Sequence, residues 1–181
     1  MDRHHSGERP AERPRPEAAV HLEGSCHCGA VRFSVEAQSP VPFMHCHCSI
    51  CRKTAGSGGF GINLGAKSAT LKVRGERHLS RYHALLREPG KRAKRSPAAR
   101  HFCRECGSPL WLYDPRWPEL VHPHASAIDT PLPKPKEVVE AALAFAPAWV
   151  DVPSGKGHVH CREWPKESLE DWHRRHGVLS E

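Results

Sequence analysis

The amino-acid sequence predicts a mainly β fold with a short helix near its C-terminal end. Short runs that alternate apolar and polar residues, typical of half-buried strands, recur between residues 30 and 113. Turn-forming residues separate most of these runs and no long amphipathic stretch lies between them, which favours an all-β core over an α/β one. A length of 181 residues suits one domain with tails.

The elements begin after a polar N-terminal segment. Residues 1–19 hold four Arg, four acidic residues and three Pro but little apolar surface, so we expect a disordered tail. The folded part is expected from about Val20. Residues 30–36 alternate most clearly, and further β-like runs follow at 42–46, 59–64, 69–73, 77–85, 100–103 and 110–113.

A strongly basic segment interrupts this pattern. From Arg87 to Arg104 there are seven Lys or Arg against one acid, Glu88, and the segment also holds Pro and Gly. We interpret it as an exposed loop that carries most of the net charge of +7. Binding of an anionic partner is the alternative, but the segment lacks the interleaved aromatic residues on which bases stack, which argues against nucleic acid.

The C-terminal third contains a Pro-rich crossing and two further elements. Residues 137–145 are ambiguous, since Ala, Glu and Leu favour a helix whereas Val138-Val139 favours a strand. The clearest helix has Ser168 as its N-cap, with Asp171 three residues on in a shortened capping box. Gly177 is expected to end it, and the helix is expected to pack on the domain as structure only.

Composition limits the class of protein. No apolar run approaches the roughly 20 residues that span a bilayer, so we expect no membrane segment. The N-terminal residues show no apolar signal-peptide core, so we expect a cytoplasmic protein. In a reducing compartment, eight cysteines indicate metal ligation or catalysis rather than disulfides.

Seven of the eight cysteines fall in three short motifs: C-x-C at Cys26 and Cys28, C-x-C-x-x-C at Cys46, Cys48 and Cys51, and C-x-x-C at Cys103 and Cys106. Clustered thiolates suit Zn or an Fe–S cluster. A structural zinc takes four protein ligands and a catalytic zinc takes three. The motifs therefore divide naturally into one closed four-thiol site and one open three-thiol site.

Other assignments stay open from the residues alone. Cys46, Cys48 and Cys51 are called the triple below. Both sites are structural if the open position of the triple is filled by Cys161, His45, His47 or His101. The triple could hold an Fe–S cluster, and the C-x-x-C could be a redox pair, although no βαβ pattern surrounds it. His122 and His124 could ligate a metal, but no third ligand is evident.

Three segments together resemble the glutathione-dependent formaldehyde-activating enzyme family, which also includes centromere protein V. They are residues 24–31 (GSCHCGAV), 45–53 (HCHCSICRK) and 102–108 (FCRECGS). The resemblance covers about residues 20–152, which leaves a tail at 1–19 and an extension with the predicted helix at 153–181. The resemblance also favours a strand over a helix for residues 137–145.

The resemblance implies an open, tent-like fold of antiparallel sheets with two zinc ions. It implies a structural zinc on Cys26, Cys28, Cys103 and Cys106. It implies a catalytic zinc on Cys46, Cys48 and Cys51. The implied activity joins glutathione to formaldehyde, which is formally a carbon–sulfur lyase reaction.

The residues beside the triple are compatible with this chemistry. A zinc ligated by three thiolates suits the capture of another thiolate, such as that of glutathione. Arg52 and Lys53 are candidates to bind glutathione's carboxylates, and His45, His47 or Ser49 to move a proton. The alternative function is a non-catalytic zinc scaffold that binds an anionic partner. The sequence does not predict an oligomeric state.

Overall fold

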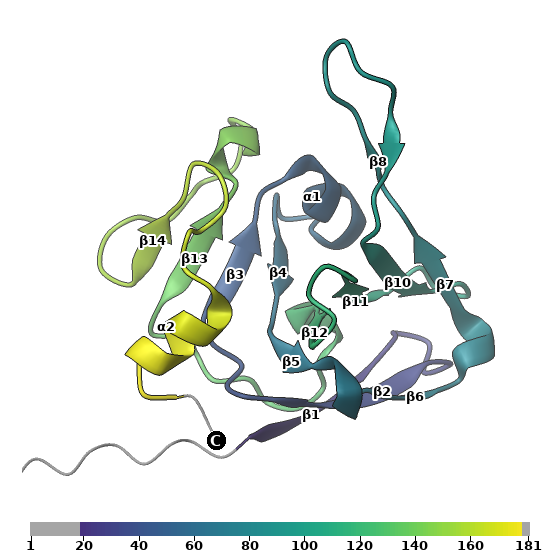
Figure 1. Cartoon of the computed structure of the whole chain (residues 1–181). Helices are drawn as coiled ribbons and strands as arrows, with labels where there is room; N and C mark the ends of the chain where they lie inside the picture. Colours follow the sequence, from purple (N-terminus) through teal and green to yellow (C-terminus); the bar gives the residue numbers. More distant parts are fainter. Residues whose placement is uncertain (1–18, 179–181) are drawn as a thin grey trace, which may run out of the picture.

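The computed structural model describes residues 19–178 and confirms a mainly β fold with a short C-terminal helix (Figure 1). Within these residues the strands form three sheets and one separate two-stranded hairpin. No helix in this part of the chain is long and apolar enough to cross a membrane. The tail expected at 1–19 lies, apart from its last residue, outside the described residues.

The first two sheets enclose the core. The first sheet is antiparallel, in the order β1 (Val20–Ser25), β2 (Arg32–Ala37) and β6 (Lys72–Arg74). The second is also antiparallel, in the order β5 (Ala66–Lys67), β12 (Leu120–Pro123), β11 (Pro109–Tyr113), β10 (Ala99–Cys103) and β7 (Leu79–Tyr82).

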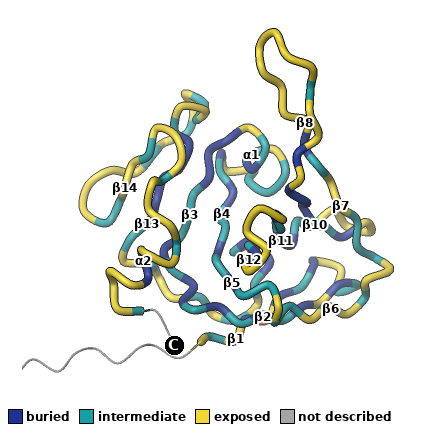
Figure 2. Tube along the Cα trace, in the orientation of Figure 1, coloured by how far each residue is buried: buried dark blue, intermediate teal, exposed yellow. Residues whose placement is uncertain are grey.

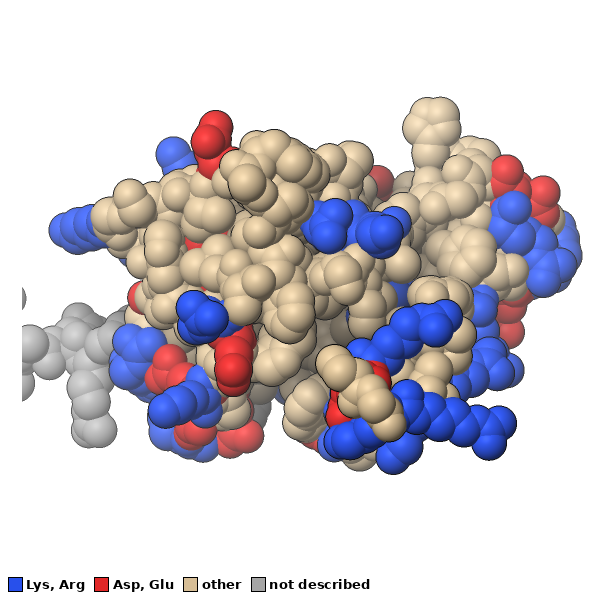
Figure 3. Space-filling view, turned by 90° about the horizontal axis from the view of Figure 1, so that it is seen from above, with Lys and Arg blue, Asp and Glu red and all other residues tan. Residues whose placement is uncertain are grey.

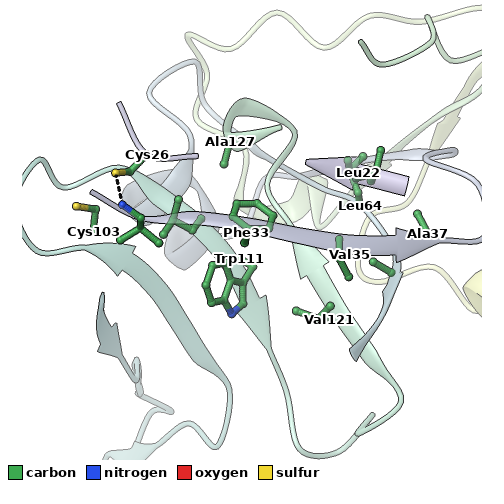
Figure 4. Close-up of a cluster of buried hydrophobic side chains, with 13 residues drawn as sticks. Leu22, Cys26, Phe33, Val35, Ala37, Leu64, Cys103, Trp111, Val121 and Ala127 are labelled. Carbon is green, nitrogen blue, oxygen red and sulfur yellow. Dashed lines mark hydrogen bonds between the residues drawn. The ribbon is translucent and has the colours of Figure 1, made fainter. Parts of the chain in front are cut away.

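Alternation in β2 produces this core, as the sequence predicted. Phe33, Val35 and Ala37 are buried while the residues between them are more exposed. The Phe33 ring meets the edge of Trp111 from β11, with ring centres 5.1 Å apart. Figure 4 shows these side chains facing Val121 across the gap between the two sheets. Burial of such apolar surface is the main stabilising contribution in the domain.

The third sheet is mixed rather than antiparallel throughout. Its order is β14 (His158–His160), β13 (Val138–Ala141), β3 (Phe43–Cys46) and β4 (Gly61–Asn63). β13 runs parallel to both β14 and β3, and β3 pairs antiparallel with β4. All four residues of β13 are buried, which explains why Val138-Val139 overrides the helical propensity nearby. The strand ends early, because Leu143–Phe145 form a 3-10 turn, η4.

Sequence patterns missed several short elements, among them α1 (Ser49–Ala55), β12 and β14. Three further 3-10 turns complete the helical elements: η1 (Ser68–Thr70), η2 (Glu76–His78) and η3 (Ala125–Ala127). The helix α1 has only seven residues, and β14 has three. Elements this short have too few residues for their periodicity to be recognised.

The first half of the basic segment, residues 87–95, lies in an exposed hairpin, as expected. Its strands are β8 (Leu85–Leu86) and β9 (Lys94–Arg95), and its turn projects from the body of the molecule (Figure 2). Figure 3 shows Lys and Arg gathered along one side of the upper face, whose middle has few charges. The expectation of an exposed loop is wrong for residues 98–103, which are buried or half-buried and mostly belong to β10. Arg100 in this strand is only 9% exposed.

The C-terminal helix α2 (Leu169–Arg175) is confirmed in detail. The Ser168 hydroxyl caps it by accepting a hydrogen bond from the Asp171 N–H at 3.0 Å, and Gly177 follows with a positive φ of 68°. Trp172 is buried, and its indole N–H donates to Glu137. With β14, which joins the third sheet, residues 153–178 form part of the packed structure.

Candidate metal centres

The structure brings the seven motif cysteines together in two groups. Cys26, Cys28, Cys103 and Cys106 form the four-thiol cluster, and Cys46, Cys48 and Cys51 form the three-thiol cluster. Within each group, all sulfurs lie within 4.8 Å of one another. These are the two groups of three or more possible metal-binding side chains within residues 19–178. Each could hold a metal ion.

The four-thiol cluster joins the two core sheets at one end. Cys26 and Cys28 follow β1, whereas Cys103 ends β10 and Cys106 is the last residue of the turn at 104–106 that leads to β11. The Sγ of Cys28 lies 3.5 Å from that of Cys26 and 3.8 Å from that of Cys103. Four thiolates around a tetrahedral zinc lie about 3.8 Å apart, given Zn–S bonds of about 2.3 Å. These distances therefore fit a zinc ion, and Figure 4 shows Cys26 and Cys103 at the end of the core.

Each pair of cysteines in this cluster is held by a tight turn. The N–H of Gly29 donates to the Cys26 carbonyl and that of Gly107 to the Cys103 carbonyl, both at 2.9 Å. Both glycines have positive φ, 74° and 75°, a conformation that a side chain disfavours. The glycine after each motif therefore shapes the turn that directs two sulfurs to one point.

Ser108 connects the two turns. Its hydroxyl accepts a hydrogen bond from the His27 N–H at 3.1 Å and lies 3.2 Å from the Cys106 sulfur. Hydrogen bonds from the Ser108 side chain and backbone lower the pKa of the Cys106 thiol to about 5. Cys106 is thus the cysteine on the exposed side of the cluster that most readily becomes a thiolate.

The three-thiol cluster is more buried and lies where β3 meets α1. Cys46 ends β3, Cys48 is the N-cap of α1 and Cys51 lies in its first turn. The Cys48 sulfur accepts a hydrogen bond from the Cys51 N–H at 3.3 Å. Hydrogen bonds from Cys46 and Cys51 lower the pKa of the Cys48 thiol, so this sulfur carries the thiolate most readily among the three.

Two polar side chains from other strands contact Cys51. The Arg100 Nη2 from β10 lies 3.8 Å from the Cys51 sulfur, and the Asn63 Nδ2 from β4 lies 3.9 Å from it. Both atoms are donors, so the Cys51 sulfur acts as an acceptor, as a thiolate does. Sequence analysis missed both residues. Arg100 was assigned to the basic segment, and no motif marks Asn63.

A buried carboxylate holds the backbone beside this cluster. The Glu140 carboxylate on β13 lies 2.7 Å from the His47 Nε2, 3.2 Å from the His45 Nδ1 and 3.5 Å from the His158 Nδ1. Burial would raise the pKa of Glu140, but hydrogen bonds from His45 and His47 outweigh it and lower that pKa to about 2. Glu140 thus anchors the residues on either side of Cys46.

The other candidate ligands lie elsewhere. Neither Cys161 nor any imidazole joins the three-thiol group within residues 19–178. His101 lies on the opposite face of β10 from Arg100, stacked on Trp111 with ring centres 5.1 Å apart. The His122 Nδ1 lies 3.1 Å from the Leu64 carbonyl oxygen. Burial, with the charge of Arg100, lowers the pKa of His124 to about 4. Among the described residues, three cysteines therefore converge at the three-thiol cluster and no fourth candidate ligand joins them.

The candidate substrate-binding residues lie on α1. Arg52 is half-buried and Lys53 is exposed, in the same helix as Cys51. Ser49, the first residue of α1, is exposed. The His45 ring is half-buried and stacks on Phe60 with centres 4.2 Å apart, whereas His47 is fully buried.

Comparison with known proteins gives matches to a family model, to a curated relative and to a solved structure. Residues 21–145 match the model of the family described as glutathione-dependent formaldehyde-activating enzyme. A protein of Halomonas elongata is 52% identical over 157 residues, which cover 87% of this chain and 97% of the relative, and it carries the provisional name glutathione-dependent formaldehyde-activating enzyme. A solved structure of a Rhodobacter sphaeroides protein is 29% identical, with a TM-score of 0.48, and covers 61% of this chain and 91% of that one.

Proposed function

The chain belongs to the glutathione-dependent formaldehyde-activating enzyme family, and on that premise we propose that it is a zinc-dependent carbon–sulfur lyase. Its proposed substrate is the adduct of a thiol with an aldehyde, most simply glutathione with formaldehyde or another small aldehyde. The observation that carries this proposal is the three-thiol cluster, where three sulfurs converge without a fourth protein ligand within residues 19–178.

The two clusters are assigned different roles. Cys26, Cys28, Cys103 and Cys106 would hold a structural zinc with a complete set of four ligands. Cys46, Cys48 and Cys51 would hold a catalytic zinc, and the fourth position is left for the substrate thiol. Zinc bound there would act as a Lewis acid that favours the thiolate form of that thiol. The donor set of three thiolates suits zinc, because soft ligands select it over magnesium or calcium.

The side chains around the triple would position the reactants. The substrate sulfur adds to the aldehyde carbon and the aldehyde oxygen takes a proton, and the reverse reaction breaks the same carbon–sulfur bond. His45 is the better candidate to move that proton, because its ring is partly exposed whereas His47 is fully buried on Glu140. Arg52 and Lys53 on α1 would pair with the two carboxylates of glutathione.

The central test combines metal analysis with turnover. We expect two zinc ions per chain and turnover of glutathione with formaldehyde that chelation abolishes. Cys48→Ser should remain folded without turnover, whereas Cys161→Ser, whose sulfur lies outside both clusters, should keep both zinc ions and full activity. Zinc-loaded protein without turnover of any glutathione–aldehyde pair would contradict the proposed reaction.

A second test addresses substrate recognition. If Lys53 binds a carboxylate of glutathione, Lys53→Gln should raise KM for glutathione roughly tenfold and leave turnover with 2-mercaptoethanol, which has no carboxylate, unchanged. The same substitution at Lys94 in the hairpin is the matched control, since this exposed lysine lies on a different element. Equal KM values in both variants would contradict the role of Lys53.

A further inference from the structure

Arg100 is a buried cation whose surroundings supply little negative charge. Its side chain comes from β10 and is 9% exposed. Within residues 19–178 no Asp or Glu pairs with it within the 4.0 Å that defines an ion pair, in contrast to exposed arginines such as Arg116 and Arg174. The Nη2 of Arg100 has the Cys51 sulfur as its partner, and its Nη1 is buried without a hydrogen-bond partner in the described part of the chain.

A buried guanidinium without a carboxylate partner is stabilised when an anion lies beside it. Burying a charge without a counterion costs several kcal/mol, and the cost falls when an opposite charge and hydrogen bonds compensate it. The polar neighbours cannot supply that charge. Asn63 is an amide, and His124 is neutral above about pH 4, the value to which burial and Arg100 lower its pKa. Among the described residues, the acceptor that lies against the Arg100 guanidinium is the Cys51 sulfur, 3.8 Å from Nη2. Its cluster would carry negative charge once three thiolates held a metal dication.

The strand fixes this orientation. Neighbouring residues of a strand point to opposite faces, so Arg100 is directed to the three-thiol cluster while His101 stacks on Trp111 on the other face. Three residues further along the strand, Cys103 belongs to the four-thiol cluster. The four-thiol cluster thus anchors one end of the strand that places Arg100 beside the other cluster.

We propose that Arg100 makes the three-thiol site selective for an anionic ligand, a substrate thiolate. This inference rests on the proposed function and deepens it. Three thiolates around a zinc dication leave a net charge of −1, and a fourth thiolate makes it −2, which is unfavourable in a buried site. The positive charge of Arg100 brings the net charge of the zinc, its four thiolates and the guanidinium to −1. The Nη2 of Arg100 contacts the Cys51 thiolate. Its Nη1 is the donor that remains for the incoming sulfur.

The test uses cobalt-substituted full-length protein, because thiolate ligands give cobalt a strong absorption band. The probe is 2-mercaptoethanol, which has a thiol but no carboxylate and so does not depend on Arg52 or Lys53. We expect Arg100→Gln to weaken probe binding about ten- to hundredfold, since a hydrogen bond to a charged group is lost. Arg100→Lys, which keeps the charge, should recover part of the affinity.

Two controls separate the outcomes. Arg81→Gln changes an exposed arginine on the neighbouring strand β7, and it should bind the probe as the unsubstituted protein does. Metal content and circular dichroism show whether each variant is folded. If Arg100→Gln does not fold, the affinity of Arg100→Lys for the probe provides the test. Equal probe affinity in the folded Arg100 variants and the unsubstituted protein would overturn the proposal, as would failure of the unsubstituted protein to bind the probe.

The result is distinguishable from failure of the proposed function. Arg100-dependent binding of 2-mercaptoethanol without turnover of glutathione and formaldehyde would support the selectivity for thiolates and contradict the reaction. Turnover in the unsubstituted protein with probe binding independent of Arg100 would support the reaction and contradict the role of Arg100.

Discussion

The two cysteine clusters use the same ligand type in different surroundings. In the four-thiol cluster, buried and exposed sulfurs alternate, and the contacts come from backbone N–H groups and the Ser108 hydroxyl. In the three-thiol cluster, all sulfurs are buried, and Asn63 and Arg100 contact one of them from two other strands. The two clusters therefore differ in the number of sulfurs and in the groups that contact them, and the spacing of the cysteines does not indicate the second difference.

The largest expected effect comes from breaking each cluster in turn. Cys103→Ser should unfold the domain, because zinc at a structural site contributes folding free energy on the order of 10 kcal/mol. The Cys48→Ser protein should unfold cooperatively at a Tm close to that of the unsubstituted protein, because its four-thiol cluster is intact. Thermal unfolding with zinc quantification checks both. A folded Cys103→Ser protein with one zinc, at the triple, would reverse the assignment of the two clusters.

A smaller effect is expected at Glu140. Glu140→Gln should lower the free energy of unfolding by about 3 kcal/mol, because it removes the charge from a buried ion-pair network. It should also weaken metal binding at the three-thiol cluster, since His45 and His47 flank Cys46. The four-thiol cluster should keep its metal. Denaturant unfolding and metal titration measure the two effects, and loss of metal from the four-thiol cluster alone would contradict this role.

The pH dependence of this variant has a definite sign. The pKa of Glu140 is lowered to about 2 in the folded protein, below its value of 4.5 in the unfolded chain. Its carboxylate therefore stabilises the fold fully above pH 4.5, and this contribution is lost as the pH falls towards 2. The difference in unfolding free energy between the unsubstituted protein and Glu140→Gln should shrink over that interval. If the difference in unfolding free energy stayed constant with pH, the charge of Glu140 would not be the cause of the lost stability.

Ser108→Ala should have a modest effect confined to the four-thiol cluster. It removes the acceptor of the His27 N–H and the contact with Cys106, so we expect a loss of about 1 kcal/mol of stability. Zinc should exchange faster from this cluster and at an unchanged rate from the triple. The matched substitution Asn63→Ala should speed zinc exchange from the triple alone. Equal effects on both clusters would show that the two sites are coupled.

The smallest effect is expected from the basic hairpin. Replacing Lys91, Arg92, Lys94 and Arg95 with Gln should change stability by less than about 0.5 kcal/mol, because all four residues are exposed in the turn and in β9. Turnover should also be unchanged. The alternative function, a zinc scaffold that binds an anionic partner, predicts instead an affinity for polyanions that falls steeply with salt and disappears in this variant. That result, without turnover, would favour the scaffold.

Local patterns in the sequence accounted for a large part of the fold. The alternation of β2, the Ser168 cap and the glycines after the cysteine motifs act within a few residues, so their effects can be read from neighbours in the chain. The β12 strand and the α1 helix were missed, because neither is long enough to show a period. The strand at Val138–Ala141 needed the resemblance to the family, since burial from both sides overrides its local propensity.

The sequence by itself determined the candidate ligands: seven cysteines in motifs, whose spacing indicated one group of four and one of three. Only the tertiary structure decided what surrounds them. Glu140 contacts His47, which is 93 residues away in the chain, and Arg100 contacts Cys51, which is 49 residues away. Both contacts arise from strand pairing and alternation in the folded sheets. Contacts of this kind depend on the register between distant strands, which the local residues do not encode.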